Sequence, residues 1–206
     1  IILKQKNIIE KYKLTKSQTD LINNFLKKIE QTNKTLNLVG HSTLNNAWDR
    51  HINDSLQLSK HIPNKRSSII DFGTGAGFPG LILSIYGYNN LVLTDSKLKK
   101  INFIKDFANK NNILIKSICS RVENIKNQKF DYIICRAFAP LPIILDYSLL
   151  FVKKNTSLLF LKGRNVKNEI NDAKKNFRFQ YKLIESESVG GGFVLIINNL
   201  YKLWWK

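Results

Sequence analysis

The chain has 206 residues, 43% of them hydrophobic, which suits one domain or one domain with a small appendage. Its formal net charge of +18 favours a polyanionic partner such as nucleic acid, although an AT-rich genome would by itself enrich Lys, Asn and Ile. No apolar run approaches the roughly 20 residues of a membrane-spanning helix, and we find no signal peptide. We therefore expect a cytoplasmic protein that does not bind a membrane.

The N-terminal part of the chain is predicted to be helical. Apolar residues recur at helical spacing in two runs, 21–29 and 44–56. His51 falls on the apolar face of the second run, where a structural histidine is expected rather than a catalytic one. A polar junction follows, so we divide the chain into an N-terminal helical extension, 1–62, and a second domain, 63–206.

Strand and helix patterns alternate over the rest of the chain. Such alternation predicts an α/β fold with a parallel sheet that is covered on both faces. Two strand-like runs without a helix between them come last, joined by a glycine-rich turn, and should form an antiparallel hairpin. We thus expect a mostly parallel seven-stranded sheet. The predicted strands are 67–72, 90–95, 113–119, 130–135, 156–161, 179–187 and 192–200, and the predicted helices are 79–86, 96–110, 140–151 and 165–176.

The two cysteines of the chain are predicted to be structural. Cys119 and Cys135 both lie in apolar, strand-like runs, so we expect buried free thiols. No cysteine or histidine spacing typical of a zinc site occurs, and we therefore expect no metal. Trp204 and Trp205 near the end are expected to pack either on the core or on a partner, and the oligomeric state stays open.

The segment 69–83 reads as a strand, a tight glycine turn and a helix. Its glycines fit two codes: Gly75, Gly77 and Gly80 match the dinucleotide fingerprint, whereas Gly73, Gly75 and Gly77 after Asp71 match the first motif of class I S-adenosylmethionine (SAM) methyltransferases. A pyrophosphate disfavours a nearby carboxylate, while the cationic aminoacyl end of SAM suits one. The position of Asp71 therefore favours SAM, and a Rossmann-like methyltransferase fold, over a nicotinamide dinucleotide.

The predicted strand ends supply further candidate residues, because ligands bind at the carboxyl ends of the strands in such sheets. Asp95 ends the second strand at the spacing where an acidic residue accepts ribose hydroxyls, although it could instead cap the next helix. Glu123 lies in a loop suited to holding adenine, with a solvated loop charge as the alternative. Arg136 follows the fourth strand and Lys162 the fifth, and both are expected on the rim where the methyl acceptor lies.

Several segments together resemble one family. These segments are Asn37-Leu38, 50–56, 71–80, 95–100, 120–123 and 136–139. They resemble the bacterial small-subunit (16S) ribosomal RNA guanine-N7 methyltransferases, known as RsmG or glucose-inhibited division protein B, over about residues 37–162. The chain departs from the family at Lys100 and Cys135, and at Gly192-Phe193, where a basic residue is usual. The last departure weakens the expectation that the hairpin contacts RNA.

The resemblance implies methyl transfer from SAM to N7 of a guanine in 16S ribosomal RNA, with ribosomal RNA or the small subunit as partner. A SAM-dependent methyltransferase of another RNA or of a protein is the alternative. Guanine N7 carries a free lone pair and no proton, so no general base is needed. Arg136 is the predicted catalytic residue, orienting the acceptor or the cofactor. The predicted cofactor-binding residues are Asp71, Gly73, Gly75, Gly77, Phe78, Asp95, Val122, Glu123 and Arg136.

Overall fold

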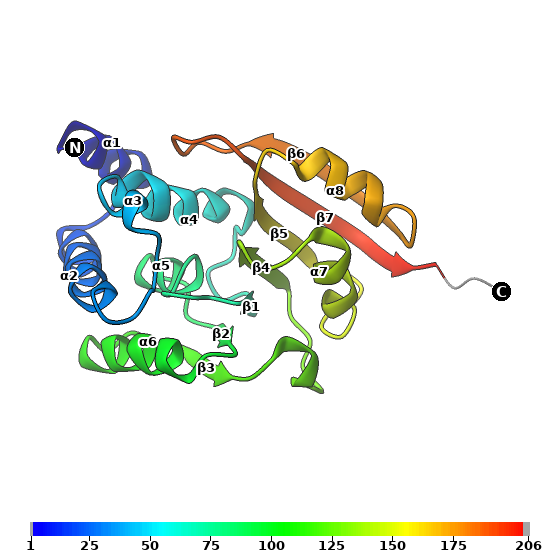
Figure 1. Cartoon of the computed structure of the whole chain (residues 1–206), viewed down its shortest axis with the longest axis horizontal. Coiled ribbons are helices and arrows are strands. Elements are labelled where there is room, and N and C mark those ends of the chain that lie inside the picture. The colour runs from blue at the N-terminus through cyan, green and yellow to red at the C-terminus, as the bar shows by residue number, and fades with distance from the viewer. Residues whose placement is uncertain (1, 204–206) are drawn as a thin grey trace.

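A seven-stranded sheet separates two helical layers in the computed structural model, which describes residues 2–203 (Figure 1). The strand order is β3-β2-β1-β4-β5-β7-β6, with β1 to β5 parallel and β7 antiparallel to both of its neighbours. The strands are β1 (Ile69–Phe72), β2 (Leu91–Asp95), β3 (Lys116–Cys119), β4 (Tyr132–Arg136), β5 (Ser157–Lys162), β6 (Phe177–Glu185) and β7 (Phe193–Lys202). The predicted fold class and the closing hairpin are confirmed.

Two apolar layers hold the sheet between the helices. The face that carries Ile69, Leu93 and Leu159 packs against the N-terminal helices and against α5 (Gly80–Ile85) and α6 (Leu98–Lys110). The opposite face packs against α7 (Leu141–Ser148) and α8 (Val166–Ala173). Successive residues of one strand pack into opposite apolar layers: Ile69 lies in the first layer and Ile70 in the second. The uninterrupted apolar runs of β1, β2 and β4 reflect this burial on both faces.

The largest difference in length from the predicted strands is in β3. β3 starts at Lys116 instead of residue 113, and it is the edge strand of the sheet, where helices cover its faces only in part. Cys119 at its end is exposed, so the prediction of a buried thiol was wrong there. Cys135, in the central strand β4, is buried as predicted.

The N-terminal segment is helical throughout most of its length, as predicted. It comprises α1 (Ile2–Tyr12), α2 (Lys16–Asn33), α3 (His41–Leu44), η1 (Trp48–Asn53), α4 (Asp54–Leu56) and η2 (Gln57–His61). A capping box formed by Thr15 and Gln18 starts α2. η1 is a π-helical turn, a wide turn that recurs at functional sites.

The N-terminal helices share their core with the rest of the molecule. Phe25 of α2 is fully buried, and its ring centroid lies 4.8 Å from that of Phe107, 5.7 Å from Phe78 and 6.0 Å from Phe103. α2 therefore packs at once against α6 and against the segment that follows the glycine turn. The division at residue 62 remains a prediction about the chain, and this packing fixes the N-terminal helices on the sheet.

The turn between β6 and β7 is anchored to the N-terminal helices. Glu187 forms ion pairs with Lys11 and Lys60, and the backbone N–H of Val189 donates to Asp49 at 2.6 Å. The residues concerned lie more than 120 positions apart in the sequence, so these bonds join the N-terminal segment to the last hairpin of the sheet. Within residues 2–203, no helix is both long and apolar enough to cross a membrane. Trp204 and Trp205 lie outside the described residues.

Candidate active site

A cavity of about 540 Å³, here called cavity A, opens at the carboxyl ends of β1, β2, β3 and β4. Of the residues predicted to bind the cofactor, Gly73, Asp95, Val122 and Glu123 line it. Phe138 also lines it, together with the cationic side chains of Lys97, Lys100 and Arg121. The strand-end reasoning thus brings together four residues from three separate segments.

The backbone fixes the Asp95 side chain at the wall of cavity A. Its Oδ2 accepts a hydrogen bond from the N–H of Gly75 at 3.1 Å, and its Oδ1 accepts one from the N–H of Lys97 at 2.9 Å. α6 begins at Leu98, so Asp95 closes the turn before the helix without being its N-cap residue. A carboxylate offers about four lone-pair positions, and two of them remain for hydroxyl groups of a ligand. The alternative of Asp95 as the helix cap is therefore wrong, and its contact with ribose hydroxyls stays a prediction.

The remaining members of the glycine motif stabilise the turn from behind. Asp71 is fully buried, and its Oδ2 accepts from the N–H of Gly80 at 2.9 Å. Gly77 packs against Leu81, since an added Cβ would lie 3.1 Å from the Leu81 Cβ. Asp71, Gly75, Gly77 and Phe78 do not line cavity A in the described chain. Their contact with a cofactor stays a prediction.

A second cavity of about 420 Å³, here called cavity B, adjoins cavity A, and Ala137 lines both. Arg136 lines cavity B and not cavity A. Its Nη1 donates to the backbone oxygen of Arg50 at 3.0 Å and lies 3.4 Å from Oδ2 of Asp54. Burial lowers the pKa of Arg136, while the Asp54 carboxylate opposes that shift. The guanidinium is therefore held in one place by the N-terminal segment.

Phe78 joins the glycine turn to cavity B. Its ring stacks on that of His51, with centroids 4.7 Å apart and planes at 15°, and the Arg136 guanidinium lies 5.0 Å from its centroid. Both of these neighbours line cavity B. Phe78 itself is buried and supports the two cavity B side chains, while its contact with the cofactor stays a prediction.

The tautomer of His51 follows from its neighbours. The Thr43 hydroxyl donates to the backbone oxygen of Gly40 at 2.6 Å, so the hydrogen bond of 2.8 Å between Thr43 Oγ1 and His51 Nε2 must be donated by the imidazole. Nδ1 then carries the lone pair, and it is buried without a partner in the described chain. Burial lowers the pKa of His51 to about 3. This neutral, enclosed ring agrees with the predicted structural role.

Sequence reasoning missed some residues of cavity B. Asp54 accepts hydrogen bonds from Gln57, Ser186 and Ser188 in addition to Arg136, and the two serines come from the β6–β7 turn. The sequence pointed to Asp54 only through its place in the segment 50–56, which resembles the family, and it gave no indication of Ser186 or Ser188. The π-helical turn η1 sets the geometry of that segment. The predicted basic residue Lys162 lines cavity B, but its ammonium is paired with Glu169 at 2.6 Å.

Asp71 and His51 are expected to give opposite pH dependences of stability. Burial raises the pKa of Asp71 from 3.8 to about 7, so between these values the folded state binds more protons and stability falls as pH rises. Burial lowers the pKa of His51 from 6.5 to about 3, so in that window the unfolded state binds more protons and stability rises with pH. Each slope approaches about 1.4 kcal/mol per pH unit. The two therefore oppose each other between about pH 4 and 6.5.

Urea unfolding at several pH values would separate the two groups. Relative to the native chain, Asp71→Asn should make the free energy of unfolding rise more steeply with pH in this window. His51→Gln should make it fall more steeply. Equal slopes in all three proteins would contradict the assignment.

Comparison with known proteins adds the family. The model of the GidB family, described as rRNA small subunit methyltransferase G, matches residues 18–191. A protein named ribosomal RNA small subunit methyltransferase G from Rickettsia prowazekii (strain Madrid E) is 38% identical, covering 97% of this chain and 98% of its own. One of the same name from Orientia tsutsugamushi (strain Ikeda) is 36% identical over 90% of this chain and 93% of its own. The chain belongs to the GidB family. The predicted resemblance and enzyme class, a SAM-dependent ribosomal RNA methyltransferase, are confirmed.

Solved structures agree on the fold. The magnesium protoporphyrin IX methyltransferase of Synechocystis PCC 6803, solved with bound SAM, superposes with a TM-score of 0.59 at 10% identity, covering 90% of this chain and 98% of its own. The ribosomal protein L11 methylase of Lactobacillus delbrueckii subsp. bulgaricus gives 0.57 at 16% identity, covering 69% and 75%. The GidB family chain thus has the class I SAM methyltransferase fold.

The side chains of cavity A fit SAM as the cofactor of a GidB family enzyme. The free lone pairs of Asp95 suit hydroxyl groups, and Val122, Phe138 and Ile143 offer apolar surface for a flat ring. The carboxylates of Asp95 and Glu123 suit a cationic ligand. No group of three or more His, Cys, Asp or Glu side chains that could hold a metal occurs among the described residues.

Asp95→Ala should weaken SAM binding by about 1–3 kcal/mol, the range for a lost hydrogen bond to a charged group. Because Asp95 also holds the N–H of Gly75, the matched variant Asp95→Asn should lose less, since its amide oxygen can keep one of the two backbone bonds. Titration calorimetry with SAM would measure both. If the folded Asp95→Ala protein bound SAM with unchanged affinity, Asp95 would not contact the cofactor and would serve only to hold the glycine turn.

Proposed function

We propose that this chain transfers a methyl group from SAM, bound in cavity A, to N7 of a guanine of 16S ribosomal RNA, bound in cavity B. The observation that carries the proposal is the shared wall: Ala137 lines both cavities, directly after the β4 residue Arg136. A donor and an acceptor on the two sides of one residue can be held close enough to react. The acceptor places the enzyme with ribosomes, which is why we expect it to act in the cytoplasm.

The chemistry asks for positioning more than for proton transfer. When bound, SAM supplies an electrophilic methyl group, and guanine N7 offers a lone pair without a proton to remove. Among the described residues that line cavity B, none offers a free base: His51 is neutral with Nδ1 buried, and the oxygens of Asp54 already accept from Arg136, Gln57 and two serines. Fixing the reactants in line can supply several kcal/mol of the barrier.

Two guanidinium groups of cavity B suit a nucleotide. Arg50 and Arg136 both line the cavity, and their donors fit the O6 of guanine or phosphate oxygens. The two are linked, because Arg136 donates to the backbone oxygen of Arg50 while Arg50 donates to the backbone oxygen of Val189 at 2.9 Å. The N-terminal segment and the β6–β7 turn thus both shape the acceptor cavity.

Mapping N7-methylguanine in 16S ribosomal RNA tests the proposal. Purified protein, isotope-labelled SAM and small subunits from cells that lack this enzyme should give one labelled guanine, detected by chemical cleavage at N7-methylguanine. Naked 16S RNA and total protein in parallel reactions cover the alternative acceptors. Label at another atom, in another RNA or in protein would overturn the proposal.

A further inference from the structure

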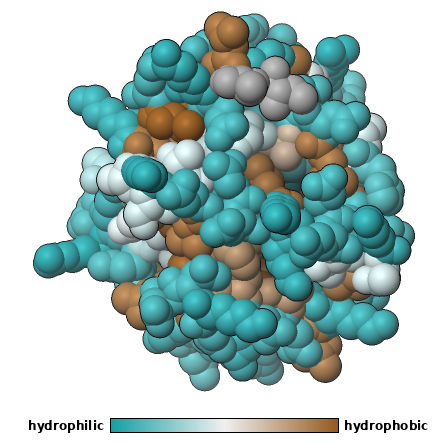
Figure 2. Space-filling view, turned by 90° about the vertical axis from the view of Figure 1, so that its left-hand side faces the viewer, coloured by the Kyte–Doolittle hydropathy of each residue, from teal (hydrophilic) through white to brown (hydrophobic). Residues whose placement is uncertain are grey.

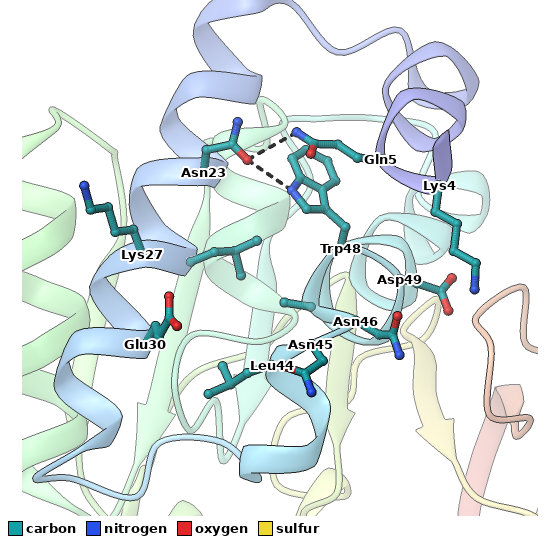
Figure 3. A pocket seen from close by; sticks show the side chains of 12 residues that line it. Lys4, Gln5, Asn23, Lys27, Glu30, Leu44, Asn45, Asn46, Trp48 and Asp49 are labelled. Carbon is teal, nitrogen blue, oxygen red and sulfur yellow. Dashed lines mark hydrogen bonds between the residues drawn. The ribbon is translucent and has the colours of Figure 1, made fainter. Parts of the chain in front are cut away.

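A third cavity of about 330 Å³, here called cavity C, lies between α1, α2 and the segment 44–49 (Figure 3). It opens on the side of the molecule formed by the N-terminal helices, which Figure 2 shows as mainly hydrophilic, with apolar atoms in the hollows. Its volume falls at the lower end of the roughly 300–1,000 Å³ of small-molecule sites. None of its lining residues lines cavity A or cavity B.

The frame of cavity C is fixed by hydrogen bonds. The Oδ1 atom of Asn23 accepts from Nε1 of Trp48 at 3.1 Å and from Nε2 of Gln5 at 3.3 Å (Figure 3). These two bonds tie α1, α2 and η1 together, and Trp48 is buried at the junction. The cavity is therefore a formed hollow between three elements.

Five polar side chains of cavity C are uncommitted, whereas the carboxylate of Asp49 already accepts from Asn53 and from the N–H of Val189. Within residues 2–203, no hydrogen bond or ion pair is formed by the side chains of Lys4, Lys27, Glu30, Asn45 and Asn46 (Figure 3). The two lysines come from different helices, α1 and α2. Asn45 and Asn46 offer amide donors and acceptors, and Leu26 and Leu44 add apolar surface. The fifth polar group, Glu30, adds one acceptor.

Cavity C is joined to the acceptor cavity through one stretch of chain. Gly40, Thr43, Arg50 and His51 line cavity B, while residues 44–49 between them line cavity C. The two cavities are thus separated by a single segment of α3 and η1. A strand of RNA with its target guanine in cavity B can pass over this segment.

We propose that cavity C binds an unpaired nucleotide of the substrate RNA close to the target guanine; this rests on the RNA substrate proposed above. Asn45, Asn46 and Glu30 match the donors and acceptors of a base edge. A nucleotide within a strand carries a phosphate on each side, which suits the lysines of the two different helices. Cavity C then sets which RNA the enzyme accepts, and it takes no part in the methyl transfer itself.

Paired variants test this on the full-length enzyme with small-subunit RNA as substrate. Lys4→Gln with Lys27→Gln should raise the KM for RNA and reduce the slope of log KM against log salt by about 1.4, since each phosphate contact with a single strand contributes about 0.7. Lys6→Gln with Lys28→Gln is the matched control, because it removes two charges from the same helices outside the cavity. The slope of log KM against log salt for this control should change less than the slope for the Lys4/Lys27 variant.

Asn45→Ala with Asn46→Ala removes base contacts without changing the charge. It should raise the KM for RNA about tenfold, the size of one base-edge interaction, and leave kcat, SAM affinity and the salt slope unchanged. Fluorescence anisotropy with oligoadenylate, which has no guanine to methylate, measures RNA binding apart from methyl transfer, with saturating SAM present to fill cavity A. The native chain should bind it more tightly than AMP, and both cavity C variants should weaken it more than the control.

The outcomes separate the two proposals. Normal methylation with equal KM and salt slope in all variants would overturn the role of cavity C and leave the proposed function standing. Absence of ribosomal RNA methylation by the native enzyme would overturn the proposed function, while oligoadenylate binding would still report on cavity C. AMP binding as tightly as oligoadenylate would mean a free nucleotide site and overturn the RNA proposal.

Discussion

Gly73→Val is expected to abolish measurable SAM binding, with a loss of at least about 100-fold in affinity. Gly73 has a φ of +63°, a region that costs a non-glycine residue about 1–3 kcal/mol and a β-branched one more. An added Cβ would lie 2.4 Å from Cδ2 of Phe138, a distance at which one of the two must move. Phe138 lines cavity A and is backed by Phe72 and Tyr147, so its ring can move only at the expense of the cavity.

The control for Gly73→Val is Gly163→Ala. Gly163 also follows a strand of the sheet, but no heavy atom lies within 4 Å of a Cβ added there, and its φ is outside the left-handed region. Calorimetry with SAM and near-ultraviolet circular dichroism would report affinity and tertiary packing for both variants. Normal SAM affinity in a folded Gly73→Val protein would contradict the assignment of cavity A.

Local patterns predicted four of the residues that line cavity A. Asp95, Val122 and Glu123 follow strands whose apolar runs are visible in the sequence, and the carboxyl ends of parallel strands meet at one edge of the sheet. Gly73 follows β1 by the same logic, although its obstacle is Phe138, which lies 65 residues later. The sequence therefore predicted the position of Gly73, and the structure supplied the reason why only glycine fits there.

Cavity B could not be predicted in the same way because its walls meet through distant contacts. In the sequence, Asp54 has no feature that marks it as a site residue. Only the folded chain shows that Ser186 and Ser188 of the β6–β7 turn donate to it. The departure at Gly192-Phe193 belongs to the same region. Phe193 lines cavity B, and a Cβ on Gly192 would lie 2.7 Å from the backbone oxygen of Lys162. Contacts between segments so far apart in the sequence arise only from the complete fold.

Arg136→Ala is expected to reduce both stability and methyl transfer. It leaves the partly buried carboxylate of Asp54 without its cationic partner, and the loss of such a charged hydrogen-bond partner costs about 1–3 kcal/mol. Burial already raises the pKa of Asp54, and loss of the guanidinium would raise it further. Urea unfolding measures the first effect. Single-turnover methylation at saturating SAM and RNA measures the second on the folded fraction.

Arg136→Lys is the matched variant that separates charge from shape. It keeps a cation beside Asp54, so most of the stability should return. Both hydrogen bonds of Arg136, to the Arg50 backbone oxygen and to Asp54, are donated by Nη1, and a lysine lacks the further Nε and Nη2 donors of the planar guanidinium. We therefore expect the single-turnover rate of this variant to lie between those of the native and Ala proteins. Full activity of Arg136→Ala would remove the residue from the site.

The same single-turnover assay tests whether methyl transfer needs a base. A general base would make the rate rise about tenfold per pH unit below its pKa. His51, with a pKa of about 3, stays neutral from pH 6.5 to 8.5, whereas the pKa of Asp71, about 7, lies within this range. Asp71 lines neither cavity, so its ionisation acts on the site indirectly, through the nearby charges of Arg136 and Asp95. We expect a slope well below tenfold per unit, and a shallower one still in Asp71→Asn. A tenfold slope that disappears in His51→Gln would instead identify the imidazole as a base and overturn the base-free mechanism.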